Sequence, residues 1–188
     1  MRILCFPLLA ALLAAGCRAP DLPVLGTVPP FTLTERDGRP VSERDLAGSV
    51  WITNFIFTHC PDICPALTGR MAELQKTLAP DQRLHLVSIS VDPAHDTPAV
   101  LADFARRAGA GPHWLFLTGD RTQIATLLRD GFHVAFADDG PPSNPITHSD
   151  LFFLVDRELQ MRGFYHGTEA QDLARLARDA ARLRKSPS

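Results

Sequence analysis

The segment Val50–Phe57 limits the fold of this chain more than any other part of the sequence. It is rich in β-branched and aromatic residues and nearly all apolar, which is typical of a β-strand buried on both faces. A second strong strand is predicted at Leu84–Val91. Because helical segments alternate with these strands, the sequence predicts an α/β domain in one piece.

The remaining predicted elements continue this alternation. Apolar residues recur at helical spacing from Ile63 to Leu78, and Thr97 or Asp96 followed by Pro98 marks another helix start. The other elements are a hairpin of 31–34 and 39–41, a helix to about 108, a strand at 114–117, a helix from 120 to about 130, a strand at 133–136, a hairpin of 151–155 and 161–165, and a helix from 169 to about 183. This order predicts a thioredoxin-like fold with an N-terminal β-hairpin extension.

The N-terminus has the pattern of an export signal. Met1-Arg2 is followed by the uncharged apolar run Ile3–Ala15, which is shorter than the roughly 20 residues of a membrane-spanning helix. The run ends in small residues before Cys17, as in a bacterial lipoprotein signal, where the cysteine receives a diacylglycerol. Ordinary secretory cleavage nearby and an uncleaved anchor are the alternatives.

We therefore expect three regions along the chain. Residues 1–16 form a lipoprotein signal peptide, residues 17–30 form the lipidated Cys17 with a proline-rich tether, and residues 31–188 form the folded domain. Prolines favour extended polyproline geometry, which suits a tether. The expected location is the bacterial periplasm, with the domain held at a membrane by its N-terminal lipid.

The charge balance argues against nucleic acid as a partner. The chain has 19 Lys and Arg residues against 21 Asp and Glu, a formal net charge of −2. A nucleic-acid-binding domain usually carries a basic face. Aromatic residues make up 7% of the sequence without a pattern, so a platform for base stacking is not predicted either.

Two cysteines remain for chemistry in the mature protein. Of the four cysteines, Cys5 is lost with the signal and Cys17 takes the lipid, which leaves Cys60 and Cys64. In an oxidising compartment such a pair is a disulfide, a metal site or a redox couple. The two residues directly follow the first buried strand, at the expected start of a helix, where the helix dipole favours the thiolate.

A metal site at this pair needs a further ligand. If the segment is helical, both thiols lie on one face, and a third ligand would complete a trigonal site suited to copper. Among the seven histidines, His148 ends a long polar loop before the strand at 151, and in a thioredoxin-like fold this loop faces the active-site helix. His59 adjoins Cys60, but the backbone direction can point it elsewhere. The others are interpreted as packing or surface residues: His85, His95, His113, His133 and His166.

Three separated motifs surround these candidate residues. The first is Phe57-Thr58-His59-Cys60-Pro61-Asp62-Ile63-Cys64-Pro65, the second is Ser90-Val91-Asp92-Pro93-Ala94-His95-Asp96-Thr97-Pro98, and the third is Thr147-His148-Ser149-Asp150. Together they resemble the Sco/SenC family of copper-binding assembly factors of cytochrome c oxidase. The resemblance implies a thioredoxin-like fold that binds one copper ion through Cys60, Cys64 and His148. Many members have Asp before the ligand histidine, where this chain has Thr147.

The resemblance implies two related functions. The first is a metallochaperone that loads the copper site of cytochrome c oxidase. The second is a membrane-tethered thiol–disulfide oxidoreductase, in which Cys60 and Cys64 reduce the cysteine pair of the oxidase copper subunit. A structural disulfide is a third, weaker alternative, because so short a loop constrains the unfolded chain little.

The expected partners are the copper subunit of the oxidase, other copper chaperones or thiol reductants, and the membrane through the lipid. The acidic residues Asp92 and Asp96 are interpreted as helix-start residues rather than metal ligands.

Overall fold

The computed structural model describes residues 21–60, 63–134 and 149–186. Its centre is a sheet in the order β1-β8-β7-β4-β5-β6-β2-β3. The strands are β1 (Gly26–Thr27), β2 (Thr32–Glu35), β3 (Pro40–Ser42), β4 (Val50–Ile56), β5 (Leu84–Ser90), β6 (Trp114–Thr118), β7 (Leu151–Val155) and β8 (Gln160–His166). The helices are α1 (Glu43–Leu46), α2 (Cys64–Leu78), α3 (Pro98–Arg107), α4 (Arg121–Thr126), which continues as a π-helical turn over Leu127–Gly131, and α5 (Ala170–Lys185).

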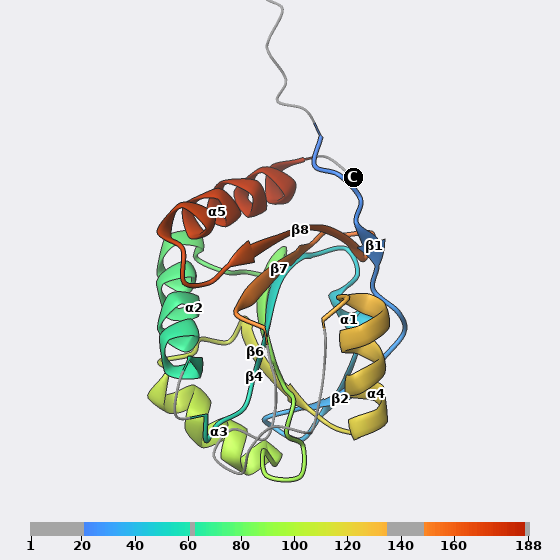
Figure 1. The fold of residues 1–188 in the computed structure, drawn as a ribbon, viewed down its shortest axis with the longest axis vertical. Coiled ribbons are helices and arrows are strands. Elements are labelled where there is room, and N and C mark those ends of the chain that lie inside the picture. Colours follow the sequence, from blue (N-terminus) through green and yellow to red (C-terminus); the bar gives the residue numbers. More distant parts are fainter. Residues whose placement is uncertain (1–20, 61–62, 135–148, 187–188) are drawn as a thin grey trace, which may run out of the picture.

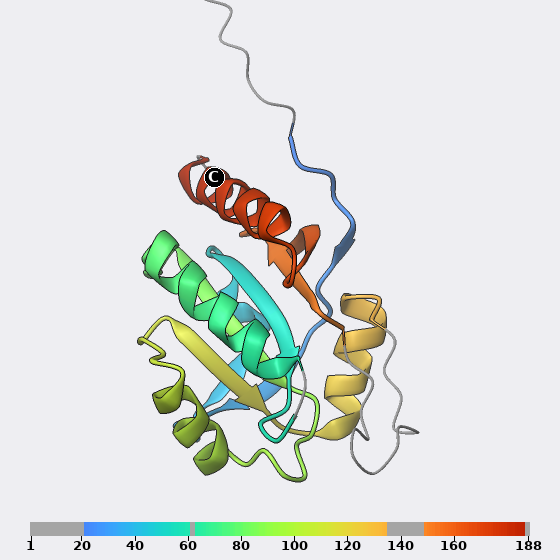
Figure 2. The same cartoon turned by 60° about the vertical axis from the view of Figure 1, so that its left-hand side comes forward.

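Strand β4 lies in the middle of the sheet and is buried along its whole length. Helices α2, α3 and α5 cover one side of the sheet, and α4 covers the other (Figures 1 and 2). Because both faces of β4 are covered, each of its side chains packs against protein, which explains the nearly continuous apolar sequence. None of the helices in the described ranges combines the length and the apolar character needed to cross a membrane.

The strand pairing is that of a thioredoxin-like fold with an added hairpin. Strands β4, β5 and β6 are parallel, while β7 pairs antiparallel with both β4 and β8. The β2–β3 hairpin joins the sheet beside β6, with Gly38 at a positive φ of 89° in its turn. Glycine adopts that conformation without steric cost. The predicted fold class and its hairpin extension are therefore confirmed.

The folded domain begins before the expected boundary at residue 31. Strand β1 pairs with β8 at the edge of the sheet. The N–H of Leu25 donates to the carbonyl of Met161 at 2.8 Å, and the N–H of Val28 donates to that of Leu159 at 2.9 Å. Val28 is also buried in the core. The edge of β8 has backbone N–H and C=O groups that can pair with a further strand, and β1 pairs with them. The last residues of the expected tether therefore belong to the sheet.

The strand expected at 133–136 is wrong for its two described residues. His133 has a positive φ of 54°, which lies outside the β region. The N–H of Val134 donates to the carbonyl of Leu128 at 2.9 Å, so this segment closes the π-helical turn instead of entering the sheet. Residues 135 and 136 lie outside the described part of the chain.

An aromatic cluster fills the space between the sheet and α4. The Phe55 ring packs edge-on against Phe132 and Phe153, with ring centroids 5.3 and 6.0 Å away. Trp51 makes an edge-on contact with Phe132 at 6.1 Å. All four side chains are buried. These rings join β4, β7 and the turn after α4 into one core.

We predict that Phe55→Ala lowers the free energy of unfolding by about 3–5 kcal/mol, because it removes a buried ring and leaves a cavity. Phe164→Ala is the matched control, since Phe164 is 51% exposed and its loss should cost less than about 0.5 kcal/mol. Urea unfolding followed by tryptophan fluorescence measures both values. Equal losses for the two variants would contradict the assignment of Phe55 to the core.

Candidate metal centre

The cysteine pair lies where β4 leaves the sheet. Helix α2 begins at Cys64, and Pro65 occupies its first turn, where a missing N–H is tolerated. Cys60 lies in the preceding turn, and its N–H donates to the carbonyl of Phe57 at 3.3 Å. The two cysteines therefore do not share one helix face. Ligand sites commonly lie at this carboxyl end of parallel strands.

Both cysteines are buried, reduced thiols. The exposed fraction is 6% for Cys60 and 1% for Cys64, and no disulfide joins them. Burial raises the pKa of the Cys64 thiol; a hydrogen bond with the Phe57 backbone opposes this, and one with Cys60 adds to it. The expectation that the helix start favours the thiolate is thus wrong for Cys64, because loss of solvent outweighs the helix dipole.

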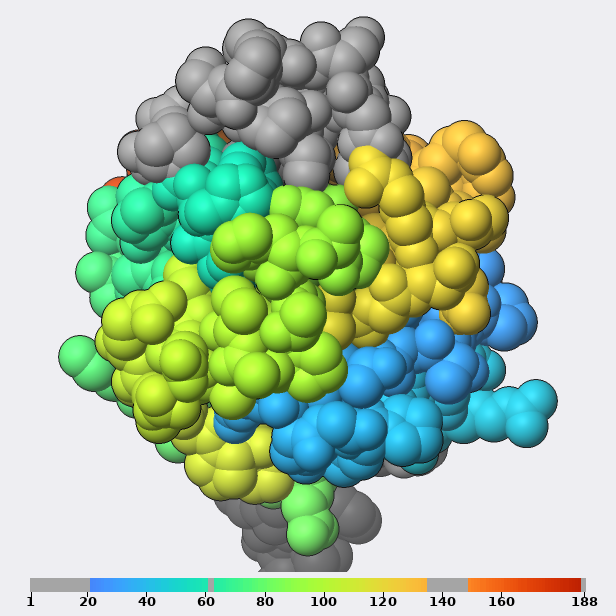
Figure 3. All heavy atoms as spheres, turned by 90° about the horizontal axis from the view of Figure 1, so that it is seen from below, coloured from blue at the N-terminus to red at the C-terminus, as the bar shows by residue number. Residues whose placement is uncertain are grey.

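Asp96 holds the loop that carries the cysteines. Its buried carboxylate accepts hydrogen bonds from the Thr58 N–H at 3.0 Å, the Thr58 hydroxyl at 2.5 Å, the Ser90 hydroxyl at 2.6 Å and Nδ1 of His95 at 3.0 Å. Thr58 lies two residues before Cys60, and Ser90 ends β5. Asp96 therefore ties together the segments that follow two neighbouring parallel strands. These two segments lie next to each other on the surface seen in Figure 3.

The helix-start interpretation of Asp96 is corrected by this network. The cap of α3 is Thr97, whose hydroxyl accepts a hydrogen bond from the N–H of Val100 at 3.4 Å. Asp96 instead points back to Thr58, which is 38 residues away in the sequence. The sequence around a helix start does not show which of two adjacent polar residues, here Asp96 or Thr97, is the cap. It also contains no information about a contact with a residue 38 positions away.

Two histidines that the sequence analysis treated separately, His59 and His95, lie together beside Cys60. The ring centroids of His59 and His95 are 4.4 Å apart. One potential ligand atom from each of them and one from Asp96 lie within 4.8 Å of one another. The sequence interpretation placed His95 at the surface, which its 53% exposed side chain confirms. It left open whether His59 points toward the site, and it did not predict that the two rings meet. The only hint was their placement directly after two predicted neighbouring strands.

The other described histidines lie away from this cluster. His85 and His113 face each other with ring centroids 5.4 Å apart, and burial, with the nearby His113, lowers the pKa of His85. His166 contacts Asp150 at 3.0 Å, and this hydrogen bond raises the pKa of its imidazole. His148, Thr147 and Cys17 lie outside the described residues.

A family model described as SCO1/SenC matches residues 23–184. The chain belongs to the SCO1/SenC family. It is 35% identical over 161 residues to the "SCO1 protein homolog" of Bacillus subtilis, covering 84% of this chain and 83% of that protein. This membership agrees with the resemblance carried by the three sequence motifs.

Two solved Sco structures share the fold. BsSco, described as a member of the Sco family of cytochrome c oxidase assembly proteins with a disulfide switch, gives a TM-score of 0.77 at 32% identity and covers 88% of this chain and 98% of its own. The structure of Bradyrhizobium japonicum ScoI with copper bound gives 0.71 at 27% identity, covering 84% and 99%.

We predict that Asp96→Ala lowers the free energy of unfolding by about 3 kcal/mol, because it leaves the buried Thr58 N–H and Ser90 hydroxyl without their acceptor. The loosened loop should also make Cys60 and Cys64 react faster with a disulfide reagent such as DTNB. Asp103→Ala is the control, since the Asp103 side chain is 56% exposed. Unchanged thiol reactivity in Asp96→Ala would contradict the anchoring role.

The pH dependence of alkylation tests the state of Cys64. Because its pKa is raised, Cys64 in the reduced, metal-free protein should react with iodoacetamide at least about 10-fold more slowly than a cysteine peptide at pH 8.5. Its rate should still rise at pH 10, where the peptide rate has levelled off. Mass spectrometry of each labelled cysteine measures both profiles. A plateau below pH 8 would contradict the raised pKa.

Proposed function

We propose that this protein binds one copper ion through Cys60, Cys64 and His148 and delivers it to the copper site of cytochrome c oxidase. The observation that carries the proposal is the pair of buried, reduced thiols at the start of α2 in a SCO1/SenC family member. Copper is the cargo here, as its presence in Bradyrhizobium japonicum ScoI suggests by analogy.

The donor set suits copper. Two thiolates are soft ligands that favour Cu(I), and imidazole binds copper in either oxidation state. Burial disfavours an isolated thiolate at Cys64, whereas a bound cation supplies the opposite charge and displaces the proton. Cys64 therefore holds its proton until the metal arrives. Three ligands leave one side of the ion open for exchange with a target.

The geometry of β7 supports His148 as the third ligand. Thr53 of β4 pairs antiparallel with Phe153 of β7, so the start of β7 lies at the same end of the sheet as the cysteines. A Cβ added at Gly167 would lie 2.5 Å from Leu67 of α2 and 2.9 Å from the Asp150 carbonyl. The backbone two residues after His148 is thus close to the helix that begins at Cys64.

Thiol–disulfide exchange with the oxidase copper subunit is a second candidate. The Cys64 thiol contacts that of Cys60, and the similar protein BsSco is described as having a disulfide switch. In this function the pair is oxidised to a disulfide while two electrons and two protons reduce the disulfide of the target. The same pair can serve both functions, because copper binding requires reduced thiols.

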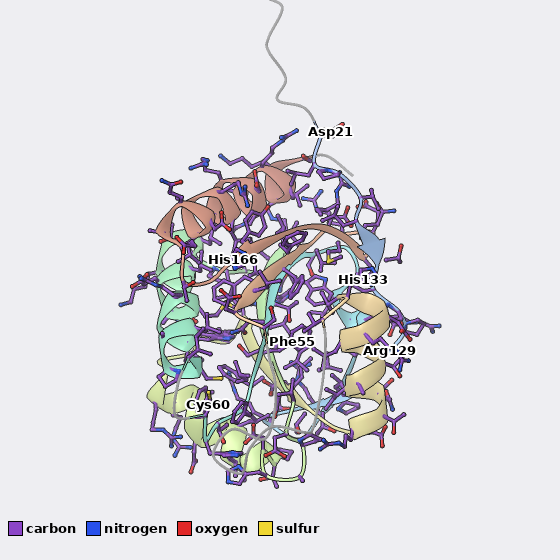
Figure 4. All side chains as sticks on the ribbon, viewed as in Figure 1. Asp21, Phe55, Cys60, Arg129, His133 and His166 are labelled. Atoms are coloured by element: carbon purple, nitrogen blue, oxygen red, sulfur yellow. The ribbon has the colours of Figure 1, made fainter. Side chains whose placement is uncertain are left out.

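We further propose that the protein acts in the periplasm, anchored by a lipid on Cys17. The sequence before Asp21 supports this, with an apolar run that ends in small residues and a cysteine. Asp21 and Cys60 lie at opposite ends of the molecule (Figure 4). An anchor on Cys17 would leave the cysteine end of the domain accessible to the oxidase subunit or to another copper chaperone.

Anaerobic titration of the reduced protein with Cu(I), in competition with a chromophoric chelator, tests the ligand set. We expect one equivalent of tightly bound copper. His148→Ala should weaken binding by more than the roughly 10–100-fold typical of a lost outer-shell partner and leave the Cys60–Cys64 redox couple intact. Cys60→Ser should abolish both properties.

His113→Ala is the matched control, because His113 lies in the separate pair with His85. Copper binding by His148→Ala equal to that of the parent would contradict the proposed ligand. If the parent binds no copper but its disulfide reduces and reforms readily, the exchange function replaces copper delivery.

A further inference from the structure

The cluster of His59, His95 and Asp96 forms a second donor set beside the cysteine pair. Within the described ranges it is the single group of three or more His, Cys, Asp or Glu residues with potential ligand atoms within 4.8 Å of one another. A fourth group, the carboxylate of Asp92, lies 3.7 Å from Nε2 of His59. The cluster uses neither Cys60 nor Cys64.

Asp96 orients one of the two imidazoles. Both oxygens of its carboxylate already accept hydrogen bonds from Thr58 and Ser90, so we assign the 3.0 Å contact with Nδ1 of His95 as an N–H···O bond from the ring. This tautomer leaves Nε2 of His95 with a lone pair. A carboxylate that fixes the ring of a histidine in this way is the usual outer-shell arrangement at metal-binding histidines. The other bonds of Asp96, to Thr58 and Ser90, hold the carboxylate itself in place.

We propose that His59 and His95 form a second metal site that binds a divalent transition-metal ion, with Asp96 as the orienting carboxylate and Asp92 as an oxygen donor. Nitrogen and oxygen donors favour Cu(II) over Cu(I), whereas the neighbouring thiols favour Cu(I). The protein would then have separate sites for the two oxidation states at one end of the sheet. The proposal does not depend on the function proposed above.

The spacing of the cluster is compatible with closure around an ion. Neighbouring ligand atoms roughly 2.0 Å from a square-planar Cu(II) ion, the geometry typical of nitrogen and oxygen donors, lie about 2.8 Å apart. The two imidazole rings, whose centroids are 4.4 Å apart, and the Asp92 carboxylate, 3.7 Å from Nε2 of His59, must therefore rearrange around the ion. The side chains of His59 and His95 are 41% and 53% exposed, which leaves both rings room to rotate. Asp96 does not need to move, because it already contacts His95.

The first test removes the thiol site and then titrates with Cu(II). In a background with Cys60→Ser, Cys64→Ser and His148→Gln, we expect one equivalent of Cu(II). Its electron paramagnetic resonance and electron spin echo spectra should show coupling to imidazole nitrogen. Circular dichroism and thermal unfolding verify that the background protein is folded. A folded background protein that binds no Cu(II) would overturn the proposal.

Single substitutions in this background then assign the ligands. His59→Gln and His95→Gln should each weaken Cu(II) binding by at least about tenfold and reduce the nitrogen coupling, whereas His113→Gln should change affinity by less than about twofold. His113 is a fair control because it also faces a second imidazole, that of His85. Equal effects of all three substitutions, or none, would overturn the assignment.

A second preparation keeps the test independent of the serine variants. The His148→Gln protein, with Cys60 and Cys64 oxidised to a disulfide, should bind Cu(II) with the same spectrum, and His95→Gln should remove that spectrum. Binding that survives His95→Gln would contradict the proposal. Because no thiol takes part, these outcomes can be separated from success or failure of Cu(I) binding at the cysteine pair.

Discussion

The buried carboxylate of Asp96 is the interaction on which this end of the molecule depends. Two central parallel strands, β4 and β5, end side by side, and the described residues that follow them leave the sheet within a few positions. Asp96 accepts hydrogen bonds from Thr58 in one loop and from Ser90 at the end of the other strand. A buried charge is costly unless it is well satisfied, and here the four donors that satisfy it also position the turn that carries Cys60.

The same end of the sheet keeps the cysteine pair away from water. Desolvation raises the pKa of Cys64 although the residue begins a helix. Neutral buried thiols are poor nucleophiles, and they become good ligands only when a cation or another proton acceptor compensates for the lost proton. Reaction at Cys64 therefore depends on a cation or a base that takes up its proton.

Asp96 also connects the two donor sets. Through Thr58 it supports the thiol pair, and through His95 it orients an imidazole. Soft sulfur donors and harder nitrogen and oxygen donors thereby lie within a few residues of each other on the segments Thr58–Cys60 and Asp92–Asp96. Asp21 lies at the opposite end of the molecule, so this chemistry and the start of the described chain are well separated.

The sequence by itself determined the local structure and the family. The apolar run of β4, the Asp37-Gly38 turn and the helical spacing of α2 predicted elements that the structure contains, because strand and helix periodicity are properties of neighbouring residues. Three motifs predicted the SCO1/SenC family and the cysteine pair. Only the tertiary structure decided that residues 26–27 complete the sheet, that Cys64 is too buried to favour its thiolate, and that Asp96 bonds Thr58 instead of capping α3. Each of these depends on contacts between segments far apart in the chain, and neither spacing nor composition records which segments meet.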